Sequence, residues 1–233
     1  MVEVGDRPIL WHIMKLYAHH GFSDFVLCLG YKGSMIKEYF LNYEAMNNDF
    51  TIRLGCESRV EFNGHHDEEG FSVTLADTGR DTMTGGRLKR VRDRVGKGTF
   101  MVTYGDGVSD LDIAALVRFH KSHGRLATVT TVRPRSRFGV LDVSQGRVSQ
   151  FAEKPKVEGW ISAGFFVFEP AIFDHLTDDD CILEREPLEH VAAEGQLMAY
   201  EHEGAFLAMD TYRDYLHLTE LWDSGQAPWK VWA

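Results

Sequence analysis

Two aspartates follow apolar segments at positions that a ligand could reach. Asp106 comes directly after the apolar run 100–104 and stands between Gly105 and Gly107, which let a ligand approach the backbone closely. Asp210 follows apolar residues and precedes an amphipathic segment. Carboxylates from two strand ends could together hold one Mg²⁺, with phosphate oxygens completing the octahedron. Each aspartate could instead cap the helix that follows it. The residues alone leave both interpretations open.

A second group of polar residues ends the predicted strand 148–153. Lys154 could contact a phosphate as a point charge, and Glu153 could accept hydrogen bonds from sugar hydroxyls. Pro155 then stops the strand, because it has no backbone N–H to donate. An exposed ion pair at a strand end is the alternative interpretation of the same residues.

A third group lies at the start of a basic helix. Gly85 and Gly86 form a flexible turn just before Arg87. Backbone N–H groups and the helix dipole at such a position favour an anion or a nucleotide carbonyl. The Lys and Arg residues that follow are also typical of a solvated helix face.

The elements that must position these residues alternate between helical and strand periods. Apolar positions at helical spacing predict helices from Asp6 to Gly21 and from Gly85 to Val95, and β-branched or apolar runs predict buried strands at 25–29, 99–104 and 126–132. This alternation predicts an α/β fold with one mixed, mostly parallel sheet and helices on both faces. We expect a single domain over residues 1–233, with a small β insertion at 42–77.

Composition and charge exclude several classes of protein. The 233 residues carry 25 Lys and Arg against 35 Asp and Glu, a net charge of −10, which disfavours binding to nucleic acid. No apolar run approaches the ~20 residues of a membrane span, and the first residues do not resemble a signal peptide. We therefore expect a cytoplasmic protein without membrane contact, in which Cys28, Cys56 and Cys181 are reduced.

Other catalytic and metal-binding patterns are missing from the sequence. It contains no Gly-x-Ser-x-Gly, no Gly-x-Gly-x-x-Gly and no Walker lysine loop. The adjacent pairs His19-His20 and His65-His66 do not have the spacing of zinc ligands. Serine hydrolases, dehydrogenases, P-loop enzymes and structural zinc proteins are thereby disfavoured.

Taken in order, the motifs resemble those of the glucose-1-phosphate cytidylyltransferase family, within the sugar nucleotidyltransferase superfamily. The resemblance runs from end to end and rests on 2–15, Thr84-Gly-Gly-Arg-Leu-Lys-Arg90, Thr103-Tyr-Gly-Asp-Gly-Val-Ser-Asp110, Arg137-Phe-Gly139, Glu153-Lys-Pro155, Gly164-Phe-Phe-Val167, Met209-Asp-Thr211 and Ala227-Pro-Trp-Lys-Val-Trp232. The segment at 84–90 and the aromatic tail look particular to the cytidylyl branch.

The resemblance implies a Rossmann-like nucleotidyltransferase fold and a Mg²⁺-dependent reaction of CTP with glucose 1-phosphate that gives CDP-glucose and pyrophosphate. In that family the product feeds deoxysugar synthesis for bacterial surface polysaccharides. By position, Asp106 and Asp210 match the metal-binding aspartates and Lys154 the lysine that contacts the sugar phosphate. We expect further substrate contacts from Gly85, Gly86, Arg87, Tyr104, Gly105, Arg137, Gly139, Glu153, Ser162 and Gly164.

The implied mechanism needs little from the protein beyond alignment and charge neutralisation. A sugar-phosphate oxygen attacks the α-phosphorus in line and pyrophosphate leaves, with no covalent enzyme intermediate. Mg²⁺, Lys154, Arg87 and Arg137 would make the pocket locally positive despite the net charge. The resemblance also implies a homo-oligomer, for which the 42–77 insertion and the tail 229–232 are candidate contact surfaces. The apolar tail could equally fold back on its own subunit.

Two departures from the family leave alternatives open. The superfamily opens with a strand and a glycine-rich phosphate loop, and we expect both to precede Met1. Ser162 stands where the glucose enzymes have an asparagine, so another hexose or nucleotide remains an alternative. A nucleotide-sugar glycosyltransferase would place Asp-x-Asp at the strand end, which Asp106 and Asp110 do not match. A nucleotide-binding relative without catalysis is the third alternative.

Overall fold

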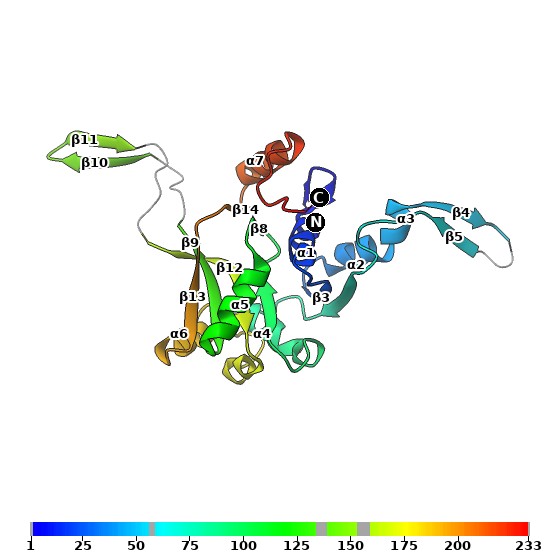
Figure 1. The fold of residues 1–233 in the computed structure, drawn as a ribbon, viewed down its shortest axis with the longest axis horizontal. Coiled ribbons are helices and arrows are strands. Elements are labelled where there is room, and N and C mark those ends of the chain that lie inside the picture. The colour runs from blue at the N-terminus through cyan, green and yellow to red at the C-terminus, as the bar shows by residue number, and fades with distance from the viewer. Residues whose placement is uncertain (1, 56–58, 134–138, 153–158, 233) are drawn as a thin grey trace.

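The centre of the fold is a four-stranded sheet. The computed structural model describes residues 2–55, 59–133, 139–152 and 159–232 (Figure 1). In the sheet the strands follow the order β13 (Leu197–His202), β9 (Ala127–Val132), β12 (Ile161–Phe168) and β7 (Phe100–Thr103). β13 is parallel to β9, whereas β12 runs antiparallel to both of its neighbours. The predicted α/β class with a mixed sheet is confirmed.

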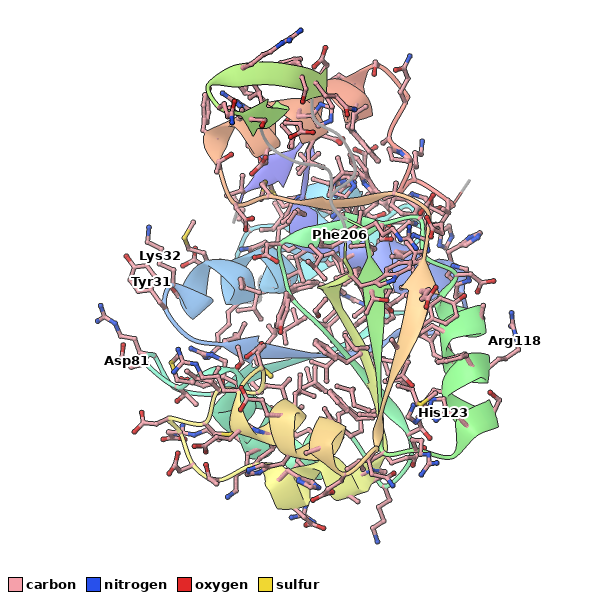
Figure 2. The ribbon with its side chains drawn as sticks, turned by 90° about the vertical axis from the view of Figure 1, so that its left-hand side faces the viewer. Tyr31, Lys32, Asp81, Arg118, His123 and Phe206 are labelled. Atoms are coloured by element: carbon pink, nitrogen blue, oxygen red, sulfur yellow. The ribbon has the colours of Figure 1, made fainter. Side chains whose placement is uncertain are left out.

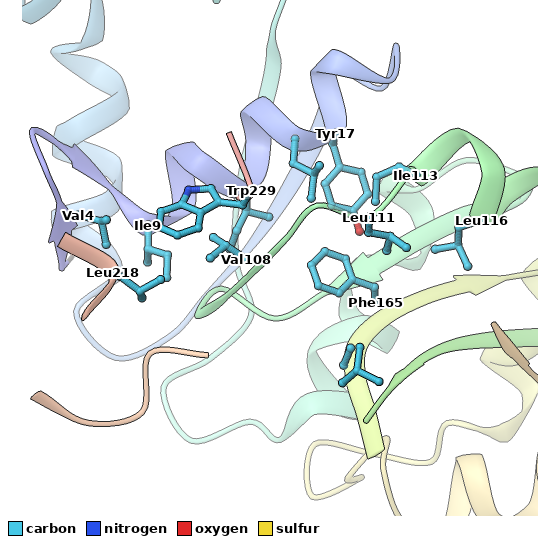
Figure 3. Close-up of a cluster of buried hydrophobic side chains, with 14 of the residues drawn as sticks. Val4, Ile9, Tyr17, Val108, Leu111, Ile113, Leu116, Phe165, Leu218 and Trp229 are labelled. Atoms are coloured by element: carbon cyan, nitrogen blue, oxygen red, sulfur yellow. The ribbon is translucent and has the colours of Figure 1, made fainter. Parts of the chain in front are cut away.

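Residues of β12 alternate between two hydrophobic cores, one on each face of the sheet. Phe165 and Val167 belong to one core and Phe166 and Phe168 to the other, as the period of a strand requires. Figure 3 shows the first core, which α1 (Ile9–His19), α5 (Ile113–His123) and α7 (Tyr212–Asp223) help to form. α4 (Thr84–Arg90), α6 (Glu186–Ala193) and the 3₁₀ helix η2 (Pro170–His175) contribute to the second. Helices therefore cover both faces, as predicted.

The strand predicted at 25–29 lies outside this sheet. β3 (Asp24–Leu29) pairs in parallel with β6 (Ser72–Asp77) and forms a separate two-stranded sheet. The prediction of one continuous sheet is therefore wrong for this pair. Only Leu29 of β3 is buried, and Cys28 is exposed, because β6 is the only described strand that pairs with β3. β6 also takes 72–77 out of the predicted insertion and into the α/β body.

Two hairpins project from opposite ends of the molecule (Figure 1). β4 (Asp49–Arg53) and β5 (Arg59–Asn63) form one of them, within the predicted insertion, after α2 (Gly33–Leu41) and α3 (Tyr43–Asn47). β10 (Val140–Ser144) and β11 (Arg147–Ala152) form the other. Nearly every residue of these four strands is exposed.

Helix boundaries differ from the predictions at two places. α1 begins at Ile9 after the short strands β1 (Glu3–Val4) and β2 (Arg7–Pro8), so Asp6 lies in a turn and caps no helix. The helix predicted to run to Val95 ends at Arg90 and is followed by the 3₁₀ turn η1 (Arg92–Arg94).

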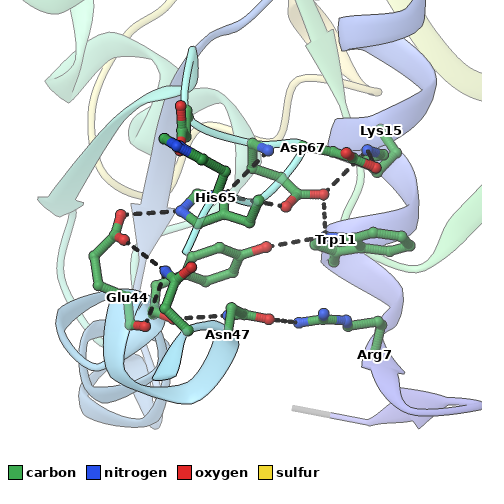
Figure 4. A network of polar contacts seen from close by, with 12 residues as sticks. Arg7, Trp11, Lys15, Glu44, Asn47, His65 and Asp67 are labelled. Carbon is green, nitrogen blue, oxygen red and sulfur yellow. Dashed lines mark hydrogen bonds and ion pairs between the residues drawn. The ribbon is translucent and has the colours of Figure 1, made fainter. Parts of the chain in front are cut away.

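A buried acid anchors the insertion to α1 (Figure 4). The Glu68 carboxylate lies 3.1 Å from Lys15 Nζ and accepts a hydrogen bond of 3.1 Å from Trp11 Nε1. Both Glu68 and Lys15 are less than a tenth exposed. Trp11 Nε1 also lies 3.1 Å from the Tyr43 hydroxyl, and Arg7 donates to Asn47. These contacts join α1 to α3 and to the segment that follows the β4–β5 hairpin.

The aromatic tail folds back on its own chain. Trp229 is 1% exposed and its Nε1 donates to Nδ1 of His12, at 3.3 Å. The His12 ring is fully buried, and its Nε2 lies 3.0 Å from the Val4 carbonyl oxygen and donates to it. Trp229 is thus part of the core, which favours the second interpretation of the tail, folding back on its own subunit, over a contact surface at this residue.

The first testable prediction concerns His12. Burial lowers its pKa to about 4, against 6.5 in the unfolded chain. Between these values the unfolded chain binds a proton that the folded protein excludes, so stability falls as the pH decreases through this window. We expect His12 to remove about 3 kcal/mol of unfolding free energy between pH 6.5 and 4. Urea unfolding at several pH values measures this loss.

In His12→Gln this part of the pH dependence should disappear. The control is His19→Gln, which removes an exposed histidine from the same helix. An unchanged pH dependence in His12→Gln would show that the ring is not held neutral by burial.

Candidate active site

A pocket of about 870 Å³ opens at the carboxyl end of β7. Its wall includes residues that follow β7, the first residues of β12, and the short strand β14 (Phe206–Ala208). Phe206 of this wall is labelled in Figure 2. Ligands in open α/β sheets bind at this edge, because the loops that follow the strands meet there.

The two predicted metal-binding aspartates line this pocket together. β14 pairs antiparallel with β8 (Gly107–Ser109), so that Asp106 and Asp210 flank the same end of one ladder. Met209 N–H continues the ladder and donates to the Asp106 carbonyl oxygen at 2.9 Å. Two residues more than 100 positions apart in the sequence are thereby brought to one place.

Neither aspartate caps a helix. The side chain of Asp112 caps α5, and Thr211 forms the capping box of α7 with Asp214. The structure therefore removes the helix-cap interpretation for Asp106 and Asp210.

The pKa of Asp106 is raised above its usual value. Partial burial contributes most to this shift, and repulsion by the nearby Asp210 adds to it. Both causes disfavour a second negative charge at this position. A cation between the two carboxylates would relieve the repulsion.

The donor set fits Mg²⁺ better than a metal held by protein ligands alone. Within the part of the chain that the structure describes, no three His, Cys, Asp or Glu side chains form a metal-binding group. Mg²⁺ in nucleotide sites commonly binds one or two carboxylates and takes its remaining ligands from phosphate and water. Asp106 and Asp210 supply two such carboxylates at the pocket.

A polar network holds the other end of the same ladder. The Asp110 carboxylate accepts hydrogen bonds from Ala205 N–H at 2.7 Å and from His202 Nε2 at 2.8 Å. Ser109 Oγ donates to the Ala205 carbonyl oxygen at 2.7 Å. Gly204 packs so tightly against Asp110 and His202 that a side chain there would collide with both. This network keeps β14 in register with β8.

Three further predicted residues line the pocket, and a fourth lies beside it. Tyr104, Ser162 and Gly164 are lining residues, and Gly105 stands between Tyr104 and Asp106. Gly164 has φ +74 and abuts the Tyr104 ring, so only glycine fits there. Tyr104 donates its hydroxyl proton to Glu184, which holds the ring in this position.

The predicted Gly85-Gly86-Arg87 segment has its polar groups engaged within the protein. The N–H groups of Gly85 and Gly86 donate to the Cys181 carbonyl oxygen at 2.9 and 3.2 Å. The Arg87 guanidinium donates to Thr78 Oγ1 at 2.8 Å and to the Gly79 carbonyl oxygen at 2.9 Å. These residues join α4 to its surroundings, and none of the three lines the pocket.

The remaining predicted residues cannot be located in the pocket. Arg137, Glu153 and Lys154 lie outside the described residues. Gly139 directly precedes β10 and is not a lining residue.

The pocket wall also contains residues that the sequence analysis missed. They are Arg133, His202, Glu203, Asp214 and His217. Arg133 and His202 stand at or next to the carboxyl ends of β9 and β13, two neighbouring parallel strands. The rule that ligands bind at such ends could have pointed to them.

Comparison with known proteins identifies the class. Residues 1–224 of this chain match the nucleotidyl transferase family. A solved structure of apo-UDP-glucose pyrophosphorylase superposes with a TM-score of 0.67 at 13% identity, over 97% of this chain and 90% of that one, which shows a shared fold. The chain belongs to the nucleotidyl transferase family and has its mixed α/β fold.

Closer relatives identify the branch. Glucose-1-phosphate cytidylyltransferases from Salmonella typhi and from Salmonella typhimurium (strain LT2) are each 51% identical to this chain over 234 residues. The match covers 100% of this chain and 90% of each relative. Within the nucleotidyl transferase family, the chain belongs with the glucose-1-phosphate cytidylyltransferases.

A second prediction tests the network around Asp110. Asp110→Ala removes the acceptor of Ala205 N–H and His202, and we expect it to lower the unfolding free energy by about 2 kcal/mol. Asp110→Asn keeps one oxygen acceptor and should lose less. Urea unfolding compares the three proteins. Equal stability of Asp110→Ala and the wild type would show that the network does not hold the ladder.

Proposed function

We propose that this protein forms CDP-glucose and pyrophosphate from CTP and glucose 1-phosphate. The observation that carries the proposal is the identity of 51% over the whole chain to enzymes named for this activity. The pocket supports it independently, because two adjacent carboxylates at a strand edge suit a metal-bound triphosphate.

The residues of this chain align the reactants. Asp106 and Asp210 hold Mg²⁺, which when bound neutralises phosphate charge. An oxygen of the sugar phosphate forms a bond to the α-phosphorus of CTP while the bond to the β-phosphate oxygen breaks, and the electron pair leaves with pyrophosphate. No general base is needed, because the attacking phosphate is already anionic.

The sequence motifs assign the remaining contacts. Lys154 and Arg137 bind phosphate groups, and Glu153 and Gly139 contact the sugar. Tyr104 and Gly105 contact the substrate, whereas Gly85 and Gly86 lie outside the pocket and donate their N–H groups to Cys181. Ser162 and Gly164 line the sugar side, where Ser162 Oγ accepts a hydrogen bond from Gly164 N–H at 3.2 Å and keeps its own proton to donate.

The protein acts in the cytoplasm, where CTP is made. None of the helices in the described residues could cross a membrane.

It forms a homo-oligomer in which the β4–β5 hairpin contacts another copy of the chain. One face of this hairpin carries the opposed pairs Phe50–Phe62 and Ile52–Val60, each side chain about half exposed. A two-stranded hairpin gains stability when such a face is covered. The charged residues of the two strands, Asp49, Arg53, Arg59 and Glu61, balance, so the strands add no net charge to such a contact.

A third prediction tests the activity. The full-length protein is given Mg²⁺, glucose 1-phosphate and one of CTP, UTP, dTTP or ATP, and pyrophosphate release is measured. We expect CTP to be preferred, and equal rates with the four nucleotides would refute the cytidylyl assignment. Asp106→Asn and Asp210→Asn should each lower kcat by about 100-fold or more.

The matched control for these variants is Asp112→Ala. It removes an aspartate that caps α5, so it should lower stability by about 1 kcal/mol while turnover is retained. Near-normal turnover in both metal-site variants would return Asp106 and Asp210 to a structural role.

A fourth prediction tests the hairpin contact. Phe62→Arg places a charge on the apolar face and should lower the molar mass measured by light scattering. Thr51→Arg changes the opposite face of the same hairpin and serves as the control. An unchanged molar mass in Phe62→Arg would exclude this face from the interface.

A further inference from the structure

Arg133 is held at the pocket wall by two side chains from different parts of the sequence. It follows β9 directly, and its guanidinium carbon lies 4.6 Å from the centroid of the Trp160 ring. Its Nε lies 3.8 Å from Glu203 Oε1. This cation–π contact with Trp160 restrains the guanidinium, which reduces the entropy that it loses on binding a ligand.

The donors of Arg133 are available to a ligand. At 3.8 Å, Arg133 and Glu203 form an ion pair, but the distance is longer than that of a hydrogen bond. Arg133 makes no side-chain hydrogen bond to any of the described residues, and its side chain is 50% exposed. A guanidinium has five N–H donors, and the half-exposed side chain of Arg133 can offer some of them to a ligand in the pocket.

Arg133 stands away from the metal-binding aspartates. Asp106 follows β7, and β12 separates β7 from β9 in the sheet. Two strand spacings correspond to about 10 Å. In the proposed reaction the phosphates meet at Asp106 and Asp210, so Arg133 reaches a part of the substrate remote from the bond that forms.

The neighbourhood of Arg133 matches the sugar side of the pocket. Val132 pairs with Ile161, and Thr131 pairs with Ser162. The Ser162 hydroxyl, Arg133 and Glu203 therefore stand on one wall. Arg133 donates, Glu203 accepts, and the two charges cancel. A neutral pair of this kind suits two adjacent hydroxyls, which both donate and accept, better than it suits an added anionic group.

We propose that Arg133 and Glu203 recognise adjacent hydroxyls of the hexose on the side of the ring remote from its phosphate, and so determine which sugar 1-phosphate the enzyme accepts. The proposal rests on the proposed function and names the specificity element of that same pocket. Ser162 contributes one further hydroxyl contact. The short reach of serine makes the Arg133–Glu203 pair the main polar contact on this wall.

The experiment compares glucose 1-phosphate with its 3-deoxy, 4-deoxy and 6-deoxy analogues, with CTP and Mg²⁺ present, in the wild type and in Arg133→Gln. In the wild type, loss of a recognised hydroxyl should lower kcat/KM by about tenfold or more, because Arg133 or Glu203 loses its partner. In Arg133→Gln the activity with glucose 1-phosphate should fall by a similar factor. The penalty for the same deoxy analogue should then largely disappear, while KM for CTP stays unchanged.

The control is Arg92→Gln. Arg92 also places a guanidinium over an aromatic ring, Phe173 at 5.5 Å, but it does not line the pocket. Its removal should leave the kinetic constants and the deoxy penalties as in the wild type. Urea unfolding confirms that both variants are folded. Trp160→Phe retains a ring beneath Arg133 and should retain part of the discrimination.

Three results would overturn the proposal. Deoxy penalties that stay the same in Arg133→Gln would show that Arg133 does not contact the sugar. A rise in KM for CTP alone would place Arg133 on the nucleotide. Preference of the wild type for glucuronic acid 1-phosphate over glucose 1-phosphate would show that Arg133 reads an anionic group. Failure of the proposed function is distinct, because the wild type would then release no pyrophosphate from CTP and glucose 1-phosphate.

Discussion

The short antiparallel ladder between β8 and β14 is the constraint on which the site depends. It contains only three residue pairs, yet it places Asp106 beside Met209 and thus beside Asp210. A slip of one residue would turn the side chains of β14 to the other face. So short a ladder cannot fix its own register, and the Asp110 network at its far end supplies what is missing. The polar contacts around Ala205 therefore determine where the carboxylates lie.

The ladder rests in turn on the first hydrophobic core. Val108 and Leu111 are buried in this core, and Phe206 and Leu207 pack against it. The same core contains Leu218 of α7, the helix that begins just after Asp210. β12 contributes Phe165 and Val167 to it, while its alternate residues hold the second core on the opposite face. Burial of apolar side chains thus fixes both sides of the pocket before any ligand binds.

Much of the fold and part of the site could be predicted because their signals are local. The strand at 100–103 is mostly apolar and the strand at 127–132 is rich in β-branched residues, and Asp106 lies three residues after the first of them. β8 and β14 could not be predicted, because three residues carry no periodicity and their pairing depends on contacts across about 100 positions. Residue type alone predicts that Gly85 and Arg87 contact the substrate. In the structure Gly85 donates to Cys181, and Arg87 donates to Thr78 and Gly79. Arg133 was missed because a single arginine after a strand has no distinctive pattern until Trp160 and Glu203 are placed beside it.

The charged residues of the pocket form two different ends, one at Asp106 and Asp210 and the other at Arg133 and Glu203. Four carboxylates line it, those of Asp106, Glu203, Asp210 and Asp214, and Arg133 is the only Lys or Arg among its described lining residues. Glu203 already balances Arg133, so the described wall offers no net positive charge to a triphosphate. Burial raises the pKa of Asp106, and repulsion by Asp210, another of these carboxylates, adds to the shift. A polyanion at the Asp106–Asp210 end therefore needs accompanying cations, which we assign to Mg²⁺, Lys154 and Arg137, whereas the Arg133–Glu203 end suits the uncharged part of a substrate. The orientation of a sugar phosphate in this pocket follows from that asymmetry.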